Sequence, residues 1–234
     1  RIVQEEVVGP SLGAQSIQQG LTSFVIAFVL LIIFMVMLYG FIPGMVANTA
    51  LILNLFFTLG IMASFQSALT MPGIAGIVLT LGMAVDANVL IYERTREELK
   101  VGKNIQQAIA EGYGNAFSAI FDSNLTSIIT GVILLVFGTG PIRGFATTLI
   151  IGIICSFFTA VFLTRLVYER QMKKDKWLGI TFDTAFSRGI FRNPTYRFMS
   201  MAKKTFTFTA VVVVLFAISF AVRGLSRSID FTGG

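Results

Sequence analysis

Residues 72–92 read P-G-I-A-G-I-V-L-T-L-G-M-A-V-D-A-N-V-L-I-Y, and this run decides the fold class of the chain. About 20 predominantly apolar residues are what an α-helix needs to cross the roughly 30 Å hydrocarbon core of a bilayer. Asp86 is the only charged residue in the run. We therefore predict a membrane-spanning helix that carries one carboxylate inside the membrane.

The composition of the whole chain extends this prediction. Of its 234 residues, 55% are hydrophobic and only 13% are charged, whereas a soluble domain carries about 25% charged residues. The mean hydropathy is +0.80. Such a chain has more apolar surface than one compact core can bury, so we expect an all-α polytopic membrane protein. Six segments have the length of a transmembrane helix: 21–40, 45–66, 72–92, 117–138, 144–168 and 205–223.

The basic residues predict the orientation of these helices. Most of the 18 lysines and arginines lie in two segments, 93–116 and 169–204, which fall on the same side of the membrane if the helices alternate. By the positive-inside rule both segments are cytoplasmic and both chain ends are outside. The net charge of +6 is thus expected to mark cytoplasmic loops rather than a nucleic-acid surface.

The same pattern divides the chain into parts. We expect an outer junction over 1–20, five helices over 21–168, a cytoplasmic linker over 169–204, a sixth helix over 205–223 and an outer segment over 224–234. Within 103–115, Ile105, Ala108 and Ile109 have helical spacing, which predicts a short amphipathic helix on the inner membrane face. Because the chain starts and stops outside the membrane, it is expected to be part of a longer protein.

Several classes of chemistry find no support. Histidine is absent, which excludes histidine-dependent catalysis and histidine-ligated metal sites, and the single Cys155 offers no disulfide framework. The segment 138–144, G-T-G-P-I-R-G, does not match a dinucleotide-binding loop. We expect no enzymatic activity, no catalytic or metal-ligating residues and no cofactor.

Asp86 is the strongest candidate for a functional residue, with Asn88 two positions later. A carboxylate inside a membrane costs about 2.5–3.5 kcal/mol on insertion scales, so it needs a partner, water or a proton. Burial favours the protonated form, which makes Asp86 a candidate proton carrier. The alternative is an aspartate that is permanently hydrogen-bonded to a neighbouring helix.

A second polar patch begins at Asp122, in the segment 122–126, D-S-N-L-T. Asp122, Thr126 and Thr130 recur every four residues and predict a polar stripe that faces the bundle interior or a water-filled path. Asn124 belongs to the same segment. Asp122 is expected at a depth similar to that of Asp86, unless it only complements the positive end of its own helix.

Small residues at four-residue intervals predict close helix packing. One series lies in the segment 72–92 and comprises Gly76, Thr80, Ala84 and Asn88, and another lies in 144–168 and comprises Gly144, Thr148, Gly152 and Ser156. These series indicate a tight bundle and do not separate static packing from sliding. Arg165 and Tyr168, close to a helix end, are expected to snorkel and to anchor at the membrane interface.

Three stretches carry a family resemblance. Residues 76–98, G-I-V-L-T-L-G-M-A-V-D-A-N-V-L-I-Y-E-R-T-R-E-E, residues 119–130, A-I-F-D-S-N-L-T-S-I-I-T, and residues 137–152, F-G-T-G-P-I-R-G-F-A-T-T-L-I-I-G, strongly resemble the membrane domain of the SecD/SecF family. V-V-G-P-S-L-G, at 7–13, resembles the SecD junction between periplasmic domain and second helix. S-I-D-F-T-G-G, at 228–234, resembles the opening periplasmic motif of SecF.

The resemblance implies a fused SecD–SecF protein with the fold of the resistance–nodulation–division transporters, in the bacterial inner membrane. The chain would span SecD helices two to six, a linker and SecF helix one, with both ends periplasmic. The implied function is accessory: such proteins use a proton or sodium gradient to promote preprotein export beside the SecYEG translocon and SecA, with YidC and YajC as further partners. Asp86 and the D-S-N-L-T segment match family motifs. A passive translocon scaffold and a small-molecule efflux transporter of the same superfamily are the alternatives.

Overall fold

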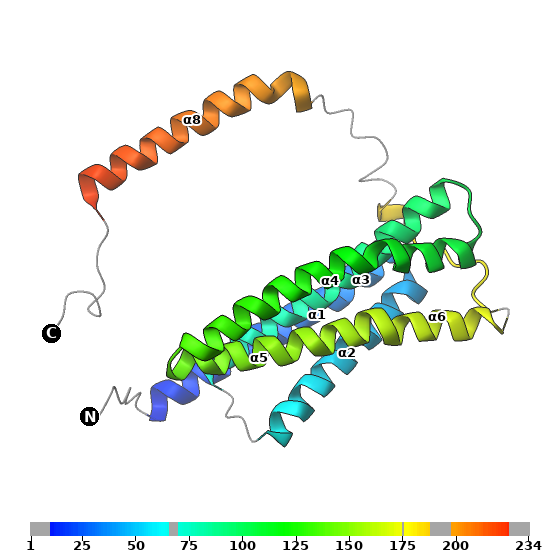
Figure 1. Cartoon of the computed structure of the whole chain (residues 1–234), viewed down its shortest axis with the longest axis horizontal. Coiled ribbons are helices and arrows are strands. Elements are labelled where there is room, and N and C mark those ends of the chain that lie inside the picture. Colours follow the sequence, from blue (N-terminus) through cyan, green and yellow to red (C-terminus); the bar gives the residue numbers. More distant parts are fainter. Residues whose placement is uncertain (1–9, 66–69, 175, 188–197, 225–234) are drawn as a thin grey trace. The chain divides into compact units, whose positions relative to one another are not determined.

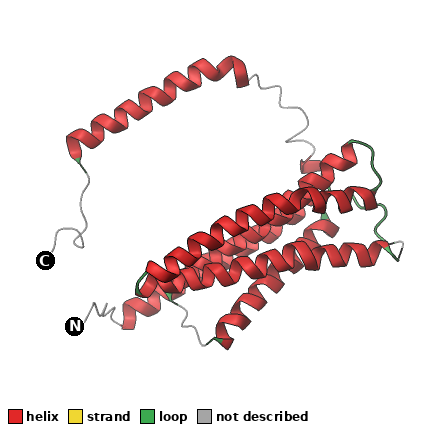
Figure 2. Ribbon diagram, viewed as in Figure 1, coloured by secondary structure: helices red, strands yellow, loops and turns green. Residues whose placement is uncertain are grey.

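The computed structural model describes residues 10–65, 70–174, 176–187 and 198–224, and these residues form helices joined by loops, with no strand among them (Figure 2). The helices, labelled in Figure 1, are α1 (Pro10–Tyr39), α2 (Phe41–Ser64), α3 (Met71–Lys100), α4 (Ile105–Phe137), α5 (Gly140–Phe157), the π-helix η1 (Phe158–Leu163), α6 (Thr164–Met172) and α8 (Phe198–Arg223). The chain forms two compact units, Arg1–Ile190 and Phe191–Gly234, which we describe separately.

The six predicted membrane-spanning segments are confirmed as helices of sufficient length and apolarity. The spans are Gln18–Tyr39, Phe41–Ser64, Met71–Lys100, Ile105–Phe137, Gly140–Met172 and Met201–Val222. The fifth span is a continuous rod made of α5, η1 and α6, because the backbone stays helical through the π-helical turn. The fold is therefore that of a polytopic helical membrane protein.

Local sequence explains where the helices begin. Gly40, with φ of +88°, separates α1 from α2 and adopts a backbone conformation that favours glycine. Thr70 caps α3, where its hydroxyl accepts a hydrogen bond from the backbone N–H of Gly73 at 3.1 Å. Asn104 caps α4 in the same way through Gln107 at 2.9 Å. Such caps satisfy backbone N–H groups that have no partner within the helix.

The first unit is built around α3, which packs against α1, α2, α4 and the α5–η1–α6 rod. The helix α1 buries few of its side chains in the unit, as expected for a helix that contacts lipid. The buried residues of α4 include a series at four-residue spacing whose first three members are small: Ala108, Gly112, Ala116, Ile120 and Asn124. Small residues let α4 approach α3 and the rod closely.

The prediction of a separate amphipathic helix over 103–115 is wrong. Residues from Ile105 onward form the first turns of α4, and Ala108 and Ile109 are buried against the rest of the unit. At about 1.5 Å per residue, α4 is roughly 50 Å long and exceeds the hydrocarbon core, so one helix both spans the membrane and projects beyond it. Gly112 and Gly114 lie in this segment without ending the helix.

The prediction that 169–204 is only a linker also needs correction. The helix α6 extends to Met172, and Ile180 and Phe182 are buried in the core of the first unit. These apolar side chains fold back because the end of the bundle offers an aromatic surface to cover. Most of 188–204 lies outside the described residues.

The second unit contributes one described element. The helix α8 presents apolar side chains on all its faces, and those described are exposed or nearly so within the chain. A helix that is apolar all round needs lipid or other helices around it. The predicted helix over 205–223 is thus present. The predicted junction over 1–20 is described only from Pro10, where α1 begins, and 225–234 lies outside the described residues.

Candidate functional site

Asp86 lies in the middle of α3, with its side chain exposed at the surface of the first unit. Its position is about 21 Å from the α3–α4 turn, at about 1.5 Å per residue, so it falls within the hydrocarbon region of a membrane-spanning helix. The carboxylate has no hydrogen-bond or ion-pair partner among the described residues of the chain. A charged group in this position requires water, an ion or a polar surface that covers it.

Asp122 lies on α4 at a comparable level. It is about 26 Å from the same turn, and so within about one helical turn of the level of Asp86. Asp122, Thr126 and Thr130 are all exposed, and the hydroxyls of Thr126 and Thr130 donate to the carbonyls of Asp122 and Thr126 at 2.9 and 3.1 Å. The hydroxyl of Ser127 likewise donates to the Ser123 carbonyl at 3.0 Å.

Within the described part of the chain the stripe does not face the interior of the bundle, whereas a stripe that faces a water-filled path stays a prediction. The buried residues of α4 at this level are Ile120 and Asn124, and a side chain two positions from each of them points away. Polar and small residues both recur every four positions here. The tighter packing of the small residues decides which series is buried.

A small cavity connects the two helices at this level. It has a volume of about 60 Å³ and is lined by Asp86 and Ala87 of α3 together with Ser123 and Asn124 of α4, among others. Asn124 is 9% exposed, so its amide lies largely inside the seam. The structure therefore brings Asp86 together with the D-S-N-L-T segment, although through Ser123 and Asn124 rather than through Asp122.

Asn88 is separated from this cavity. Its side chain is 2% exposed, its amide nitrogen donates to the carbonyl of Ala84 at 3.2 Å, and its amide oxygen has no hydrogen-bond partner among the described residues. The described residues contain no group of three acidic or cysteine side chains suited to a metal ion. The arrangement leaves two carboxylates, those of Asp86 and Asp122, exposed at the surface of the first unit. We call Asp86, Asp122, Thr126 and Thr130 the carboxylate face.

The two series of small residues meet between α3 and α5. A Cβ atom on Gly152 would lie 2.5 Å from the Thr80 hydroxyl, and one on Gly76 would overlap the Thr148 hydroxyl. Thr80, Ala84, Thr148 and Ser156 are all buried. Gly144 lies in the same way against Thr70, at the start of α3. The backbones of the two helices approach so closely that only glycine fits at the points of contact.

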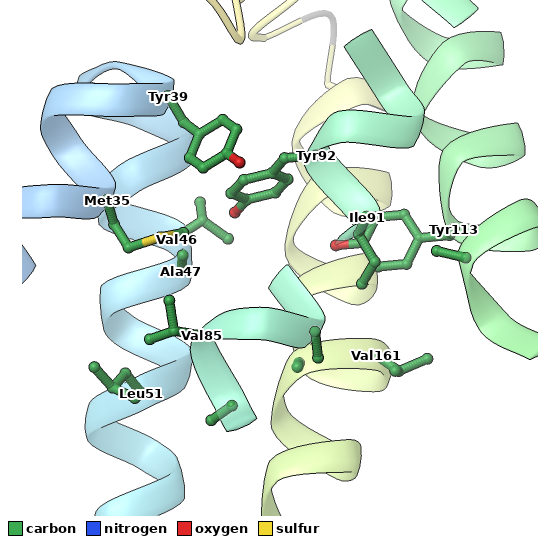
Figure 3. Close-up of a cluster of buried hydrophobic side chains, with 14 of the residues drawn as sticks. Met35, Tyr39, Val46, Ala47, Leu51, Val85, Ile91, Tyr92, Tyr113 and Val161 are labelled. Atoms are coloured by element: carbon green, nitrogen blue, oxygen red, sulfur yellow. The ribbon is translucent and has the colours of Figure 1, made fainter. Parts of the chain in front are cut away.

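Sequence reasoning missed a cluster of aromatic side chains at one end of the bundle. Figure 3 shows Tyr39 of α1 beside Tyr92 of α3, with Tyr113 of α4 on the other side of α3. The rings of Tyr39 and Tyr92 pack edge to face with centroids 5.1 Å apart, and Phe182 lies 5.2 Å from Tyr92. Tyr168 contacts Tyr92, Tyr113, Trp177 and Phe182. We call this the tyrosine cluster.

Every described hydroxyl in the tyrosine cluster has a hydrogen bond. Tyr39 donates to Glu93 at 3.0 Å, Tyr92 to the Pro43 carbonyl at 2.9 Å and Tyr113 to Thr164 at 2.7 Å. The Tyr168 hydroxyl donates to that of Tyr92 at 3.1 Å. Tyr168 is fully buried, so the expectation that it anchors at the membrane interface is wrong, whereas Arg165 is exposed and pairs with Glu169.

Arg96 joins this end of the bundle to residues beyond α6. Its guanidinium donates to Glu93 at 2.7 Å and to the Ser187 hydroxyl at 2.8 Å, and it pairs with Asp183. The Arg96 side chain is only 8% exposed. One signal in the sequence could have indicated this ion pair. Glu93 and Arg96 follow Tyr92 at a spacing that places them on adjacent turns of one helix. The partner residues 183 and 187 could not be foreseen, because they are distant in the chain.

Comparison with known proteins agrees with these features. Residues 1–174 match the family described as protein export membrane protein SecD/SecF, C-terminal. The chain belongs to the SecD/SecF family. Over 173 residues it is 56% identical to the protein translocase subunit SecD of Magnetococcus marinus. The aligned residues make up 74% of this chain and 33% of the Magnetococcus protein. The SecD subunit of Rhodothermus marinus is 54% identical over 168 residues, covering 72% of this chain and 27% of that protein.

A solved structure extends the match to nearly the whole chain. The crystal structure of SecDF, a translocon-associated membrane protein from Thermus thermophilus, superimposes with a TM-score of 0.85 at 36% identity, covering 97% of this chain and 30% of that one. The chain thus spans about a third of the length of the SecD/SecF proteins it matches. Together with the six membrane-length helices, these matches identify a SecD/SecF-type, multi-pass inner-membrane protein of the resistance–nodulation–division type.

Proposed function

We propose that this SecD/SecF chain acts as part of an accessory unit of the bacterial Sec translocase, and that Asp86 couples a proton or sodium gradient to preprotein export. The observation that carries the proposal is the carboxylate of Asp86, which lies inside the membrane-spanning helix α3 without a hydrogen-bond or ion-pair partner among the described residues. Intramembrane acids of this kind mark ion and proton pathways. The solved SecDF is itself described as translocon-associated, which supports the same partners here.

The physical mechanism follows from the charge of Asp86. An ionised carboxylate at this level favours an arrangement in which water or polar groups reach it, and a neutral one tolerates an apolar cover. Ion uptake from one side of the membrane would therefore favour one arrangement of the helices, and ion release to the other side would favour the second. Moving one charge through 100 mV supplies about 2.3 kcal/mol, which is enough to shift such an equilibrium.

The seam between α3 and α5 provides the surface on which such a shift could occur. Glycine–threonine contacts at Gly152–Thr80 and Gly76–Thr148 bring the backbones close without large interlocking side chains. The orientation that we propose puts the tyrosine cluster at the cytoplasmic end of the helices and the basic segments in the cytoplasm. Asp86 and the polar stripe of α4 then lie at similar depth, with both carboxylates exposed at the surface of the first unit.

The test compares preprotein export in cells that carry wild type or Asp86→Asn in the complete protein, at matched membrane levels. Glu97→Gln is the control, because it makes the same change from carboxylate to amide on α3 at an exposed residue paired with Arg94. We expect Asp86→Asn to abolish gradient-dependent export and Glu97→Gln to leave it unchanged. Measuring export with the proton or the sodium gradient collapsed identifies the coupling ion.

Unchanged export in Asp86→Asn would contradict the proposal and favour a passive translocon scaffold. That alternative predicts that bulky residues at Gly152 and Ser156 impair export while Asp86 is dispensable. Normal export combined with lost extrusion of a small molecule would instead favour an efflux transporter. Both outcomes can be told apart from an insertion defect, because membrane levels are measured in the same cells.

A further inference from the structure

An open apolar groove runs along the first unit between α2 and the α5–η1–α6 rod. It has a volume of about 280 Å³, and its lining includes Phe41, Met45, Thr49, Leu53, Val167 and Trp177. The two hydroxyls in its wall, those of Thr49 and Thr164, already donate to helix carbonyls. The groove therefore presents an apolar surface to whatever occupies it.

The dimensions of the groove fit a single hydrocarbon chain. From Phe41 to Leu53 it extends about 18 Å along α2, close to the thickness of one leaflet of a roughly 30 Å hydrocarbon core. The groove is open on one side, and its length and apolar lining suit one extended acyl chain.

Basic residues without an ion pair in the described part of the chain lie beyond one end of the groove. Arg170 follows Val167 by three residues on α6, and Lys174 lies in the turn just after α6; both line a neighbouring hollow together with Leu166, Glu169 and Lys173. Among the described residues, neither is part of an ion pair, whereas Arg165, on another side of α6, pairs with Glu169 at 2.7 Å. Lys176, which directly precedes Trp177, likewise has no ion-pair partner in the described part of the chain.

Trp177 fixes the level of this end relative to the membrane. Its backbone has φ of +65°, and its half-buried indole packs against Tyr168 with ring centroids 6.1 Å apart, at the mouth of the groove. Tryptophan with neighbouring lysines and arginines is typical of the membrane–water interface, where lipid head groups lie. The apolar length of the groove then extends from the head-group level into the leaflet.

We propose that this groove is a binding site for a phospholipid with an anionic head group. One acyl chain lies between Phe41, Thr49, Leu53 and Val167, and the phosphate contacts Arg170 and Lys174. Clusters of lysine and arginine next to membrane-spanning helices recognise anionic lipids through this charge complementarity. The site is distinct from the carboxylate face, which shares none of its lining residues.

The single tryptophan of the chain reports on the site directly. The chain is reconstituted into phosphatidylcholine vesicles that contain a small, equal fraction of brominated phosphatidylglycerol or brominated phosphatidylcholine, and quenching of Trp177 fluorescence is measured. We expect at least twofold more quenching by the brominated phosphatidylglycerol, because bromine on a bound acyl chain lies beside the indole.

Two variants separate the head-group site from the groove. Arg170→Gln with Lys174→Gln removes the two charges and is expected to bring the quenching ratio of the two lipids close to one. Thr49→Phe, at an exposed position on α2, fills the groove and is expected to halve quenching by both lipids. Lys203→Gln with Lys204→Gln on α8 removes the same charge elsewhere in the chain and is expected to preserve the twofold preference.

Three results would overturn the proposal. Equal quenching of the wild type by both lipids would show ordinary exposure to the bilayer. Absence of quenching by either lipid would show that protein, either another segment or a second copy, covers the groove. An undiminished preference for phosphatidylglycerol in the Arg170→Gln, Lys174→Gln variant would place the anionic lipid elsewhere.

Discussion

The tyrosine cluster and the carboxylate face are both polar, but they differ in the burial of their polar groups and in the partners of those groups. In the tyrosine cluster Tyr92 and Tyr168 are buried, and each hydroxyl donates to an acceptor inside the chain. On the carboxylate face Asp86 and Asp122 are exposed, and neither side chain has a hydrogen-bond or ion-pair partner among the described residues.

The difference separates polar residues that stabilise the fold from those free to interact with something else. A buried hydroxyl without a partner costs about 1–3 kcal/mol, so a polar core persists only if its hydrogen bonds are complete. An intramembrane carboxylate without a partner within the chain brings no stability. We therefore expect mutation of such a carboxylate to affect export more than stability, and mutation of the tyrosine cluster to affect stability.

The largest expected effect is on export and concerns Asp122. In the complete protein, Asp122→Asn is expected to reduce gradient-dependent export about tenfold or more, because the stripe on α4 lies at the level of Asp86. The free energy of unfolding should change by no more than about 0.5 kcal/mol, since no described contact of the side chain is lost. Export assays and unfolding in detergent check both parts; a large loss of stability would assign Asp122 to the fold instead.

Next comes Gly152→Leu, which should destabilise the bundle by about 3 kcal/mol. The new side chain would meet Thr80, and the two packed helices cannot separate without losing their other contacts. Gly82→Leu on α3 is the matched control, because a Cβ at Gly82 meets nothing within 4 Å. Thermal unfolding of both variants tests the prediction, and equal unfolding midpoints would refute it.

Arg96→Ala should cost about 2 kcal/mol, less than a fully buried ion pair, since Glu93 and Asp183 remain partly exposed. Limited proteolysis should also cut 176–187 faster, because that segment loses its contacts through Asp183 and Ser187. The control is Arg94→Ala, whose exposed pair with Glu97 contributes at most about 1 kcal/mol. Identical proteolysis of the two variants would mean that Arg96 does not hold the segment.

Tyr168→Phe removes one hydroxyl from the tyrosine cluster and should lower the free energy of unfolding by about 1 kcal/mol. The ring packing against Tyr92 and Phe182 is retained, so the fold should persist. Chemical unfolding measures the change. An increase in stability would show that the hydrogen bond between Tyr168 and Tyr92 is not favourable.

The smallest effect concerns the α3–α4 turn, where hydrogen bonds to Glu111 and Glu98 raise the pKa of Lys103. A raised pKa stabilises the folded state at every pH below the unfolded value of about 10.4, and the contribution is lost as pH rises through the folded value. The unfolding midpoints of wild type and Lys103→Met should therefore differ equally at pH 7 and pH 9 and converge as the pH rises through the folded pKa. A difference that persists at the highest pH at which the protein stays folded would exclude the charge of Lys103 as its source.

Much of the fold could be predicted from the sequence, because membrane-spanning length and small-residue spacing are local properties. The six spans and the four-residue series at Gly76 and Gly144 needed only the order of residues in one segment. The exposure of the polar stripe at Asp122 could not be predicted, because two series on α4 have the same period and only packing shows which is buried. The position of Asp86 beside Asn124 likewise depends on how two helices meet.

The sequence by itself determined that this is a helical membrane protein of the SecD/SecF family with a carboxylate inside a membrane-spanning segment, since hydrophobic length and family motifs are written in consecutive residues. Only the tertiary structure decided that Tyr168, Phe182 and Asp183 close one end of the bundle. It also decided that Asp86 is left without a described partner. Both outcomes depend on contacts between residues that lie far apart in the chain, which no local pattern specifies.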